Sequence, residues 1–219
     1  RAPSHPGCAG AAAEGHQRPL LLYLFDAYCP WSYGYLPALT GLVDRVGDEA
    51  DVEVVSIGLH RGTPLAQSAP PLLAVQRATG VGFGPRFRRV LSTGAVALDS
   101  AAAAATVVAL LAAAPGRPAD VLRAAHRHHF WSGGTLSEPG DASRVAARLG
   151  LDAEAVEVFA RSSRAADLAS DDLELARSLG ARRGPTLLVS HRERLSELEG
   201  PGASGETLVD QFRRALGRA

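Results

Sequence analysis

FDAYCPWSYG, residues 25–34, joins two runs of different periodicity and decides the fold of this chain. Before it, residues 20–26, LLLYLFD, form an apolar run of strand length, which is typical of a strand buried on both faces. After it, the pattern is helical as far as Val46. The apolar stripe of this helix consists of Tyr35, Leu36, Leu39, Leu42, Val43 and Val46. Pro30 suits the first turn, where its missing N–H costs no intrahelical hydrogen bond.

The pattern changes twice further along the chain. Residues 51–57 alternate well enough for a second strand, and a strand, a helix and a strand in succession predict a βαβ unit with parallel strands. We find no convincing strand between Pro64 and Gly180. The helical patterns there cover residues 101–114, 119–130, 141–149, 152–162 and 171–179. Strands return at residues 186–190 and near 195–198, and a helix at 204–216 closes the chain.

Composition excludes several classes of function. Twenty-three basic residues balance 23 acidic ones in 219 residues, so no global field attracts nucleic acid or an anionic membrane. The longest near-apolar run, residues 101–114, is too short to span a bilayer. Residues 1–18 carry no apolar core for a signal peptide, and a leader removed before Arg1 stays open. Two cysteines are too few for a disulfide scaffold, so we expect a cytoplasmic globular protein.

The split order of strands, with a cysteine at the start of the first helix, resembles the DsbA-like thioredoxin-fold family and, within it, the FrnE-like subgroup. The match is carried by Asp26, Cys29-Pro30-Trp31 and Tyr33-Gly34, by LDSAAAA at residues 98–104 and by SDDLELARSLGARRGPTLLV at residues 170–189. The resemblance covers residues 20–217 and implies an α/β thioredoxin fold whose βαβ and ββα halves are separated by a large all-helical domain.

The expected domain organisation follows from that fold. It consists of a flexible tail at 1–18, a thioredoxin-like domain at 19–62 and 181–219, and an inserted helical domain at 63–180. Cys8 falls in the tail, where we interpret it as a residue without a role. The alternative is that the tail folds back and Cys8 resolves a disulfide of Cys29.

Cys29 is the candidate nucleophile. Backbone N–H groups at a helix N-terminus stabilise a thiolate, which predicts a pKa for Cys29 below the ~8.5 of a free thiol. The alternative, a buried and inert cysteine, is less consistent with a position between a strand and Pro30.

Ser32 is the departure from the family pattern, which is Cys-Pro-Trp-Cys. It lies one turn after Cys29, so its hydroxyl can donate a hydrogen bond to the thiolate but cannot displace a bound partner. A mixed disulfide of Cys29 would therefore persist until an outside thiol attacks. A natural monothiol enzyme, an engineered trap and loss of redox function all stay open.

Residues around this motif are the other candidates. Asp26 precedes Cys29 by three positions and either shuttles protons for the thiol or caps the helix. The resemblance implies that Pro185 is cis and faces the cysteine, so that backbone near it pairs with substrate or glutathione. Trp31 is expected to be exposed, and Tyr28 and Tyr33 either line the site or pack in the core. The candidate substrate contacts are Pro30, Trp31, Tyr33, His60, Arg183, Gly184, Pro185 and Thr186.

Basic residues outside the motif are weaker candidates. His60 and Arg61 follow the second strand, near the carboxyl ends where open α/β sheets bind ligands. The pair Arg182-Arg183 precedes the proline loop and either holds a carboxylate of a substrate or of glutathione or simply lies in water. His126 and His129 are one turn apart, but no carboxylate or cysteine completes a metal site nearby in sequence. We expect them on a solvated helix face and predict no metal.

Three functions remain. The first is a thiol–disulfide oxidoreductase that acts through Cys29, by mixed-disulfide exchange or isomerisation. The second is a small-molecule isomerase or glutathione-linked transferase that uses Cys29 as a reversible nucleophile, because the resemblance extends to kappa-class glutathione transferases and hydroxychromene carboxylate isomerases. The FrnE-like subgroup takes its name from polyketide biosynthesis, which suggests a substrate of that kind. The third is a non-catalytic binding protein. The expected partners are a small-molecule thiol, disulfide or electrophilic metabolite, or a protein disulfide. Glutathione is the candidate co-reactant, and no tightly bound cofactor is predicted. A homodimer is left open.

Overall fold

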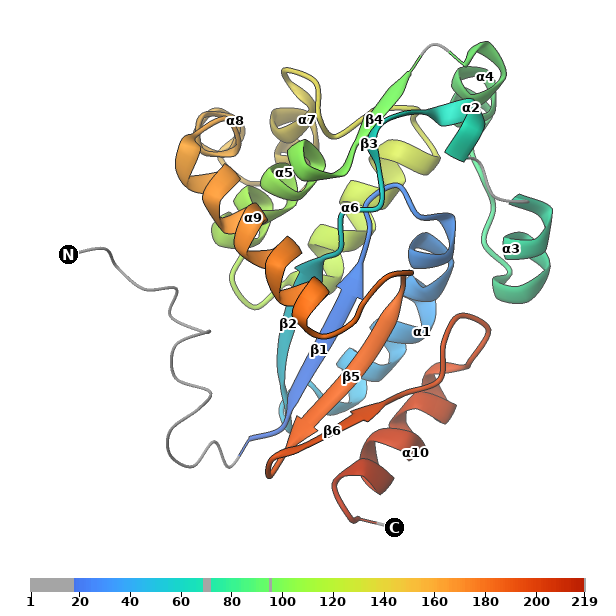
Figure 1. Cartoon of the computed structure of the whole chain (residues 1–219), viewed down its shortest axis with the longest axis vertical. Coiled ribbons are helices and arrows are strands. Elements are labelled where there is room, and N and C mark those ends of the chain that lie inside the picture. Colours follow the sequence, from blue (N-terminus) through green and yellow to red (C-terminus); the bar gives the residue numbers. More distant parts are fainter. Residues whose placement is uncertain (1–17, 69–71, 95, 219) are drawn as a thin grey trace.

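The computed structural model describes residues 18–68, 72–94 and 96–218, and a four-stranded mixed sheet lies at its centre (Figure 1). The strands are β1 (Leu20–Phe25), β2 (Asp51–Ser56), β5 (Thr186–His191) and β6 (Arg194–Glu197), in the order β2-β1-β5-β6. β1 pairs parallel with β2 and antiparallel with β5, and β5 pairs antiparallel with β6. The predicted parallel βαβ unit is therefore confirmed.

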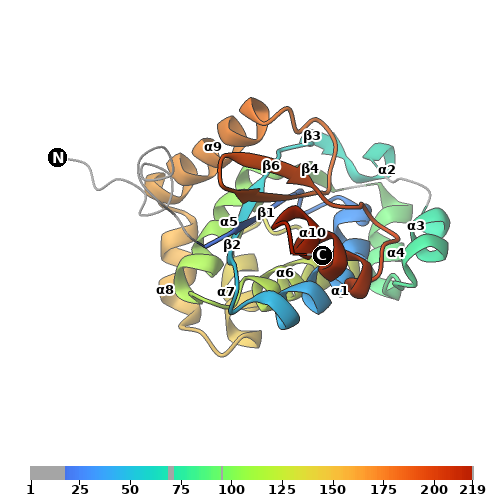
Figure 2. The same ribbon diagram turned by 90° about the horizontal axis from the view of Figure 1, so that it is seen from below.

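Helices cover both faces of this sheet (Figures 1 and 2). α1 (Pro30–Val46) and α10 (Gly205–Ala215) pack against each other on one face, and α9 (Ser163–Ser178) packs against β2 on the other. Burial on both faces explains why β1 is apolar at every position: five of its six residues are buried.

The remaining helices lie in the sequence between the two halves of the sheet. They are α2 (Leu65–Ser68), α3 (Leu72–Thr79), α4 (Pro85–Thr93), α5 (Ser100–Ala113), α6 (Pro118–Phe130), α7 (Asp141–Arg148) and α8 (Ala153–Ala160). α5 contacts each of α6, α7, α8 and α9, and its alanines allow close helix approach. Asp99 caps α5 by accepting the amides of Ala101 and Ala102, at 3.0 and 3.1 Å. The order β-α-β, helices, β-β-α confirms the predicted fold class.

Two sequence predictions were wrong in detail. β3 (Arg61–Pro64) and β4 (Ala97–Asp99) form a small antiparallel ladder where we expected no strand after Pro64. Strands of four and three residues are too short for alternation to show. α9 begins at Ser163, well before the predicted residue 171, because the Ser162 side chain caps it by accepting the amide of Ala165.

Within the described residues, no helix has both the length and the apolar composition that crossing a membrane requires. The predicted tail, with Cys8, lies outside the described residues apart from Arg18.

Candidate functional site

Cys29 lies at the junction of β1 and α1. It is the N-cap residue of α1, and Pro30 takes the first helical position. The Cys29 amide donates to the Asp26 carbonyl at 3.1 Å, and the Cys29 carbonyl accepts the Tyr33 amide at 3.1 Å. No side chain caps this helix, so the free amides of its first turn are directed toward the thiol region. The junction therefore places a sulfur atom at the positive end of the helix dipole.

The Cys29 thiol is nevertheless buried, with 7% of the residue exposed. Burial raises the pKa of the thiol, while hydrogen bonds from the Ser32 amide and hydroxyl and from the Trp31 amide lower it. The charge of Asp26 also raises it. The predicted pKa below that of a free thiol is therefore wrong for the free protein, because desolvation outweighs the helix N-terminus.

Ser32 is fully buried beneath Cys29. Its hydroxyl oxygen accepts the amide of Asp26 at 3.3 Å, and its carbonyl accepts the hydroxyl of Tyr23 at 3.1 Å. The hydroxyl thus links the end of β1 to the first turn of α1, in addition to its effect on the thiol. A serine here also contributes no sulfur with which to resolve a disulfide of Cys29.

Asp26 does not cap α1, contrary to one of the two sequence alternatives. Its carboxylate accepts the Tyr28 amide at 2.9 Å and the Leu59 amide at 2.8 Å. The residue is 1% exposed and holds the loop after β2 against the turn after β1. The proton-shuttle role stays a prediction.

The loop before β5 faces the thiol. The Cys29 sulfur lies 3.8 Å from the Gly184 carbonyl oxygen, within reach of an S–H···O hydrogen bond. The Gly184–Pro185 peptide is cis, as the family resemblance implied. A Cβ atom on Gly184 would lie 2.7 Å from Ile57 Cδ1 and 3.5 Å from Ser32 Oγ, so a larger residue there requires the loop or the end of the Ile57 side chain to move. Thr186 follows as the first residue of β5 and is half-buried.

Aromatic side chains anchor the active turn in the helical part of the chain. Tyr28 is buried and donates to the Thr135 carbonyl and, at 3.3 Å, to the Ser137 hydroxyl. The Tyr33 hydroxyl donates to the Gly82 carbonyl at 3.1 Å. Trp31, expected to be exposed, is half-buried and packs on the hydrophobic core. Because the Tyr28 and Tyr33 contacts join residues far apart in the chain, no sequence pattern indicates them.

The loop that accepts Tyr28 is itself held by a buried carboxylate. Asp141 accepts the Thr135 hydroxyl at 2.8 Å and contacts His128 Nε2 at 2.7 Å. Burial would raise the pKa of Asp141, but hydrogen bonds from His128, Arg144 and Thr135 hold it well below its ordinary value. The carboxylate therefore stays charged and fixes the loop.

The histidines of α6 are buried, so the predicted solvated face is wrong. His126 and His129 are 0% and 1% exposed, and the ring Nδ1 atoms contact the carbonyls of Leu122 and Gly134. Burial lowers the pKa of each from 6.5 to about 4, so both are neutral at neutral pH. In the described part of the chain, no group of three His, Cys, Asp or Glu side chains is arranged to hold a metal ion.

The basic candidates lie at the rim of the site. His60 is half-buried, its ring centroid lies 6.1 Å from that of Tyr28, and its amide donates to the Ser100 hydroxyl at 3.0 Å. Arg61, Arg182 and Arg183 are exposed, and no carboxylate among the described residues pairs with them. These guanidinium groups are free to contact an anion.

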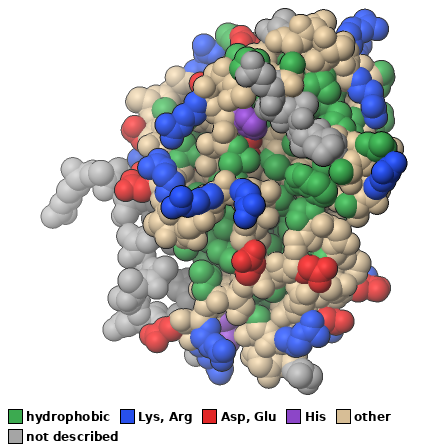
Figure 3. All heavy atoms as spheres, turned by 45° about the vertical axis from the view of Figure 1, so that its right-hand side comes forward, with side chains coloured by type: hydrophobic (Ala, Val, Ile, Leu, Met, Phe, Trp, Pro, Cys, Tyr) green, Lys and Arg blue, Asp and Glu red, His purple; other side chains and the backbone are tan. Residues whose placement is uncertain are grey.

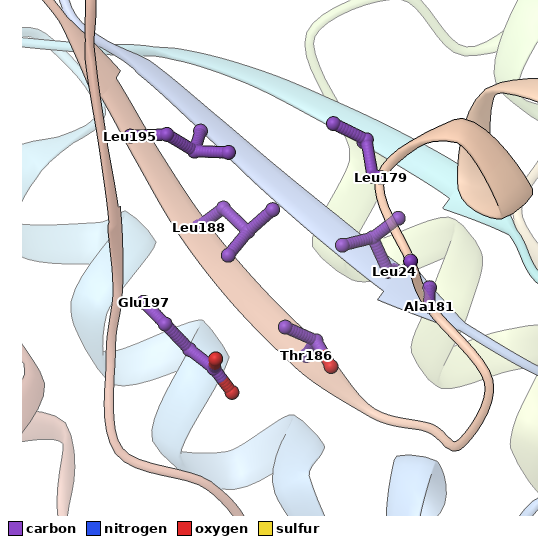
Figure 4. Close-up of a pocket in the computed structure, with 8 residues that line it drawn as sticks. Leu24, Leu179, Ala181, Thr186, Leu188, Leu195 and Glu197 are labelled. Carbon is purple, nitrogen blue, oxygen red and sulfur yellow. The ribbon is translucent and has the colours of Figure 1, made fainter.

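A hollow of about 300 Å³ lies beside the proline loop, on the sheet face that α9 covers in part (Figure 4). Its walls include Leu24, Leu188 and Leu195, with Thr186 and Glu197 at one end. Cys29 does not line it. The hollow is therefore separate from the thiol.

A cysteine at the first turn after a central strand, opposite a proline loop, defines the thiol-active class of thioredoxin-fold proteins. The chain belongs to the DSBA-like thioredoxin domain family, whose model matches residues 21–217. The predicted resemblance to the DsbA-like family is thereby confirmed.

Solved structures give the same class. The chain resembles the cytosolic disulfide reductase DsbM from Pseudomonas aeruginosa, with a TM-score of 0.72 and 28% identity over 90% of this chain and 97% of that one. The structure of the same reductase with GSH gives a TM-score of 0.69 and 29% identity, over 90% and 97% of the two chains. A protein from Nitrosomonas europaea, provisionally named a protein disulfide isomerase, gives a TM-score of 0.78 and 18% identity over 92% and 98%, which shows the fold alone. A search among curated proteins gives no match. These results agree with the predicted class, a thiol-dependent oxidoreductase or isomerase.

Proposed function

We propose that this protein catalyses thiol–disulfide exchange through Cys29 alone, in the direction of reduction or isomerisation. The observation that carries the proposal is the position of the Cys29 sulfur, 3.8 Å from the Gly184 carbonyl, with the hydroxyl of Ser32 where the second sulfur of a dithiol pair would lie. A substrate disulfide that enters between α1 and the proline loop meets one sulfur nucleophile and one stabilising hydroxyl.

The reaction has two balanced steps. The Cys29 thiolate attacks a mixed disulfide of a substrate with glutathione, the Cys29–glutathione bond forms, and the substrate leaves as a thiolate that takes up a proton. A second glutathione thiolate then attacks the Cys29–glutathione bond, which releases glutathione disulfide and regenerates the Cys29 thiolate. Glutathione supplies both electrons, so the cycle needs no second cysteine.

The raised pKa of Cys29 favours this direction. A thioredoxin-fold oxidant is strong when its reduced cysteine is stabilised as a thiolate, and a low cysteine pKa reflects that stabilisation. Burial of Cys29 works against that stabilisation. A thiolate of higher pKa is the better nucleophile once formed, although a smaller fraction of the thiol is then ionised at neutral pH. The chemistry therefore fits attack on disulfides, rather than donation of a disulfide to other proteins.

The resemblance to DsbM, which is described as cytosolic and has been solved with GSH, supports glutathione as the co-reactant and the cytoplasm as the compartment. Arg61 follows His60 and Arg183 precedes Gly184, and the exposed guanidinium groups of both suit the two carboxylates of glutathione. These residues, with His60 and Trp31, are the proposed contacts for the small thiol.

The test is reduction of a peptide–glutathione mixed disulfide by glutathione, with the parent protein and with Cys29→Ala. We expect the parent to accelerate the reaction and the variant to leave the uncatalysed rate. Equal rates would overturn the proposal. Turnover of an electrophilic metabolite in the absence of any added thiol would favour an isomerase instead.

A further inference from the structure

Charge is unevenly distributed along this neutral chain. Residues 54–98 contain five arginines, at positions 61, 77, 86, 88 and 89, and no Asp or Glu, although basic and acidic residues are equal in number over the whole sequence. Arg182 and Arg183 add two more positive charges directly before the proline loop. All seven side chains belong to exposed residues. We call them the arginine rim.

Two arginines of the rim directly adjoin, in the chain, residues that lie at the thiol site. Arg183 directly precedes Gly184, whose carbonyl contacts the Cys29 sulfur, and Arg61 directly follows His60, whose ring packs against Tyr28. Three further arginines, Arg86, Arg88 and Arg89, lie on α4 and are exposed. Between them, Phe87 packs inward with its ring centroid 5.2 Å from that of His129, which in turn lies 4.9 Å from that of Tyr28. Two ring contacts thus connect α4 with the residue that precedes Cys29.

No carboxylate in the described part of the chain forms an ion pair with this rim. None of the seven guanidinium groups lies within ion-pair distance of a carboxylate there. Asp99 is opposite Arg61 in the β3–β4 ladder, but its carboxylate accepts the amides at the start of α5. Like charges that lack counterions destabilise a fold through mutual repulsion. An anionic ligand that binds to these arginines would relieve this repulsion.

Two large apolar side chains in the same stretch of chain are exposed. Leu59 and Leu73 are 37% and 57% exposed, and the backbone amide of Leu59 is bonded to Asp26 beside the thiol. Figure 3, which brings forward the side carrying α3 and α4 in Figure 1, shows arginine side chains on both sides of a hydrophobic area. An apolar centre with an arginine rim is the composition of a protein-binding surface.

We infer that the arginine rim is a docking surface for polypeptide substrates whose disulfide is flanked by acidic residues. This inference rests on the proposed function, since the docked disulfide is the one that Cys29 attacks. The exposed leucines favour a polypeptide over nucleic acid, which binds through phosphates and needs no apolar surface. Glutathione has only two carboxylates, fewer than the seven arginines of the rim.

The experiment compares two peptides of equal length, each carrying one cysteine as a mixed disulfide with glutathione, one flanked by Glu and the other by Lys. Rates of reduction by glutathione are measured at low and at physiological ionic strength. We expect the Glu peptide to have roughly tenfold higher kcat/KM at low salt, and the difference to shrink as salt screens the rim. In the double variant Arg86→Glu/Arg89→Glu, the preference should be lost or reversed.

The matched control is Arg213→Glu/Arg214→Glu, which changes the same charge on exposed positions of α10, at the other end of this side of the molecule (Figure 1). It should keep the preference of the parent. Equal rates for both peptides would overturn the docking surface and leave the proposed function standing. No exchange with either peptide would instead reject the proposed function, and the docking surface with it. Binding of duplex DNA that is lost only in the α4 variant, without a peptide preference, would assign the rim to nucleic acid and overturn the inference.

Discussion

The sulfur of Cys29 and the carbonyl oxygen of Gly184 lie 3.8 Å apart, although 155 positions separate the two residues in the chain. The contact joins the first turn of α1 to the loop before β5. The loop packs closely beside the thiol, because a Cβ atom on Gly184 would lie only 2.7 Å from Ile57 Cδ1. The close contact between the Gly184 carbonyl and the Cys29 sulfur therefore contributes to burial of the thiol, and it limits the space that a substrate can enter.

Gly184→Ala should disturb this approach. The new Cβ atom would lie 2.7 Å from Ile57 Cδ1, so the loop or Ile57 must shift. We expect kcat/KM for disulfide exchange to fall by at least about tenfold, since a displacement of about 1 Å in a reacting geometry has effects of this size or larger.

The control is Gly200→Ala, because a Cβ atom there would meet no atom within 4 Å and its φ angle is not in the left-handed region. Its exchange rate should equal that of the parent. A Gly184→Ala protein with the parental rate would show that the loop does not set the geometry of attack.

Ser32→Ala should raise the pKa of Cys29 further, because the lost hydroxyl is one of the groups that lower it. The rate of alkylation of Cys29 by iodoacetamide, followed against pH by peptide mass, reports this pKa. We expect the midpoint of the parent to lie above the ~8.5 of a free thiol and that of the variant to lie higher still. A midpoint that falls in the variant would mean that the Ser32 hydroxyl does not stabilise the thiolate.

Tyr28→Phe should loosen the active turn from the helical part of the chain. The hydroxyl is buried and donates to the Thr135 carbonyl, so its loss leaves that acceptor without this donor and should cost about 1–2 kcal/mol of unfolding free energy. Because Tyr28 adjoins Cys29, kcat should fall as well.

Tyr35→Phe provides the comparison, since this hydroxyl donates to the Glu199 carbonyl, away from the thiol. Its stability loss should be similar, with kcat unchanged. If the two variants lose activity equally, the effect of Tyr28 is general destabilisation and not positioning.

The buried histidines should make stability fall with acidification. In the unfolded chain His126 and His129 titrate near 6.5, whereas burial lowers the pKa of each to about 4 in the folded protein. Between these values the unfolded state binds more protons, so the free energy of unfolding decreases as the pH falls from 6.5 toward 4.

Asp172 of α9 opposes this trend. Burial raises the pKa of its carboxyl to about 7, with further increases from Asp171 and Glu53, although the Ser56 amide donates to it at 3.2 Å. Between about 4 and 7 the folded state therefore holds the extra proton, and this group alone makes stability rise as the pH falls. The parent should lose about 1 kcal/mol between pH 6 and pH 5, and Asp172→Asn about 2 kcal/mol. Chemical denaturation at both pH values measures the unfolding free energy of each protein. If the parent and Asp172→Asn lose the same amount between pH 6 and pH 5, Asp172 is charged throughout this range.

Local patterns in the sequence predicted both elements that flank the turn at residues 26–29, namely β1 and α1. The apolar run of β1 and the stripe of α1 follow from local burial, and the cysteine between them follows from the junction. The burial of Cys29 could not be predicted, because Gly184 and Ile57 come from distant segments. The buried α6 histidines were misjudged for the same reason: the rings that cover them, among them Phe25 and Tyr33, come from β1 and α1. Short elements such as β3 and β4 were missed because tertiary pairing, and not propensity, determines them.

The most direct test of single-cysteine exchange is to mix the reduced protein with glutathione disulfide and to map the products by peptide mass. We predict one glutathionyl group on Cys29, stable until glutathione is added and then lost as the free thiol returns. An adduct that disappears without added thiol, together with a disulfide between Cys29 and Cys8, would contradict the claim that Cys29 acts alone. So would the absence of any adduct on Cys29.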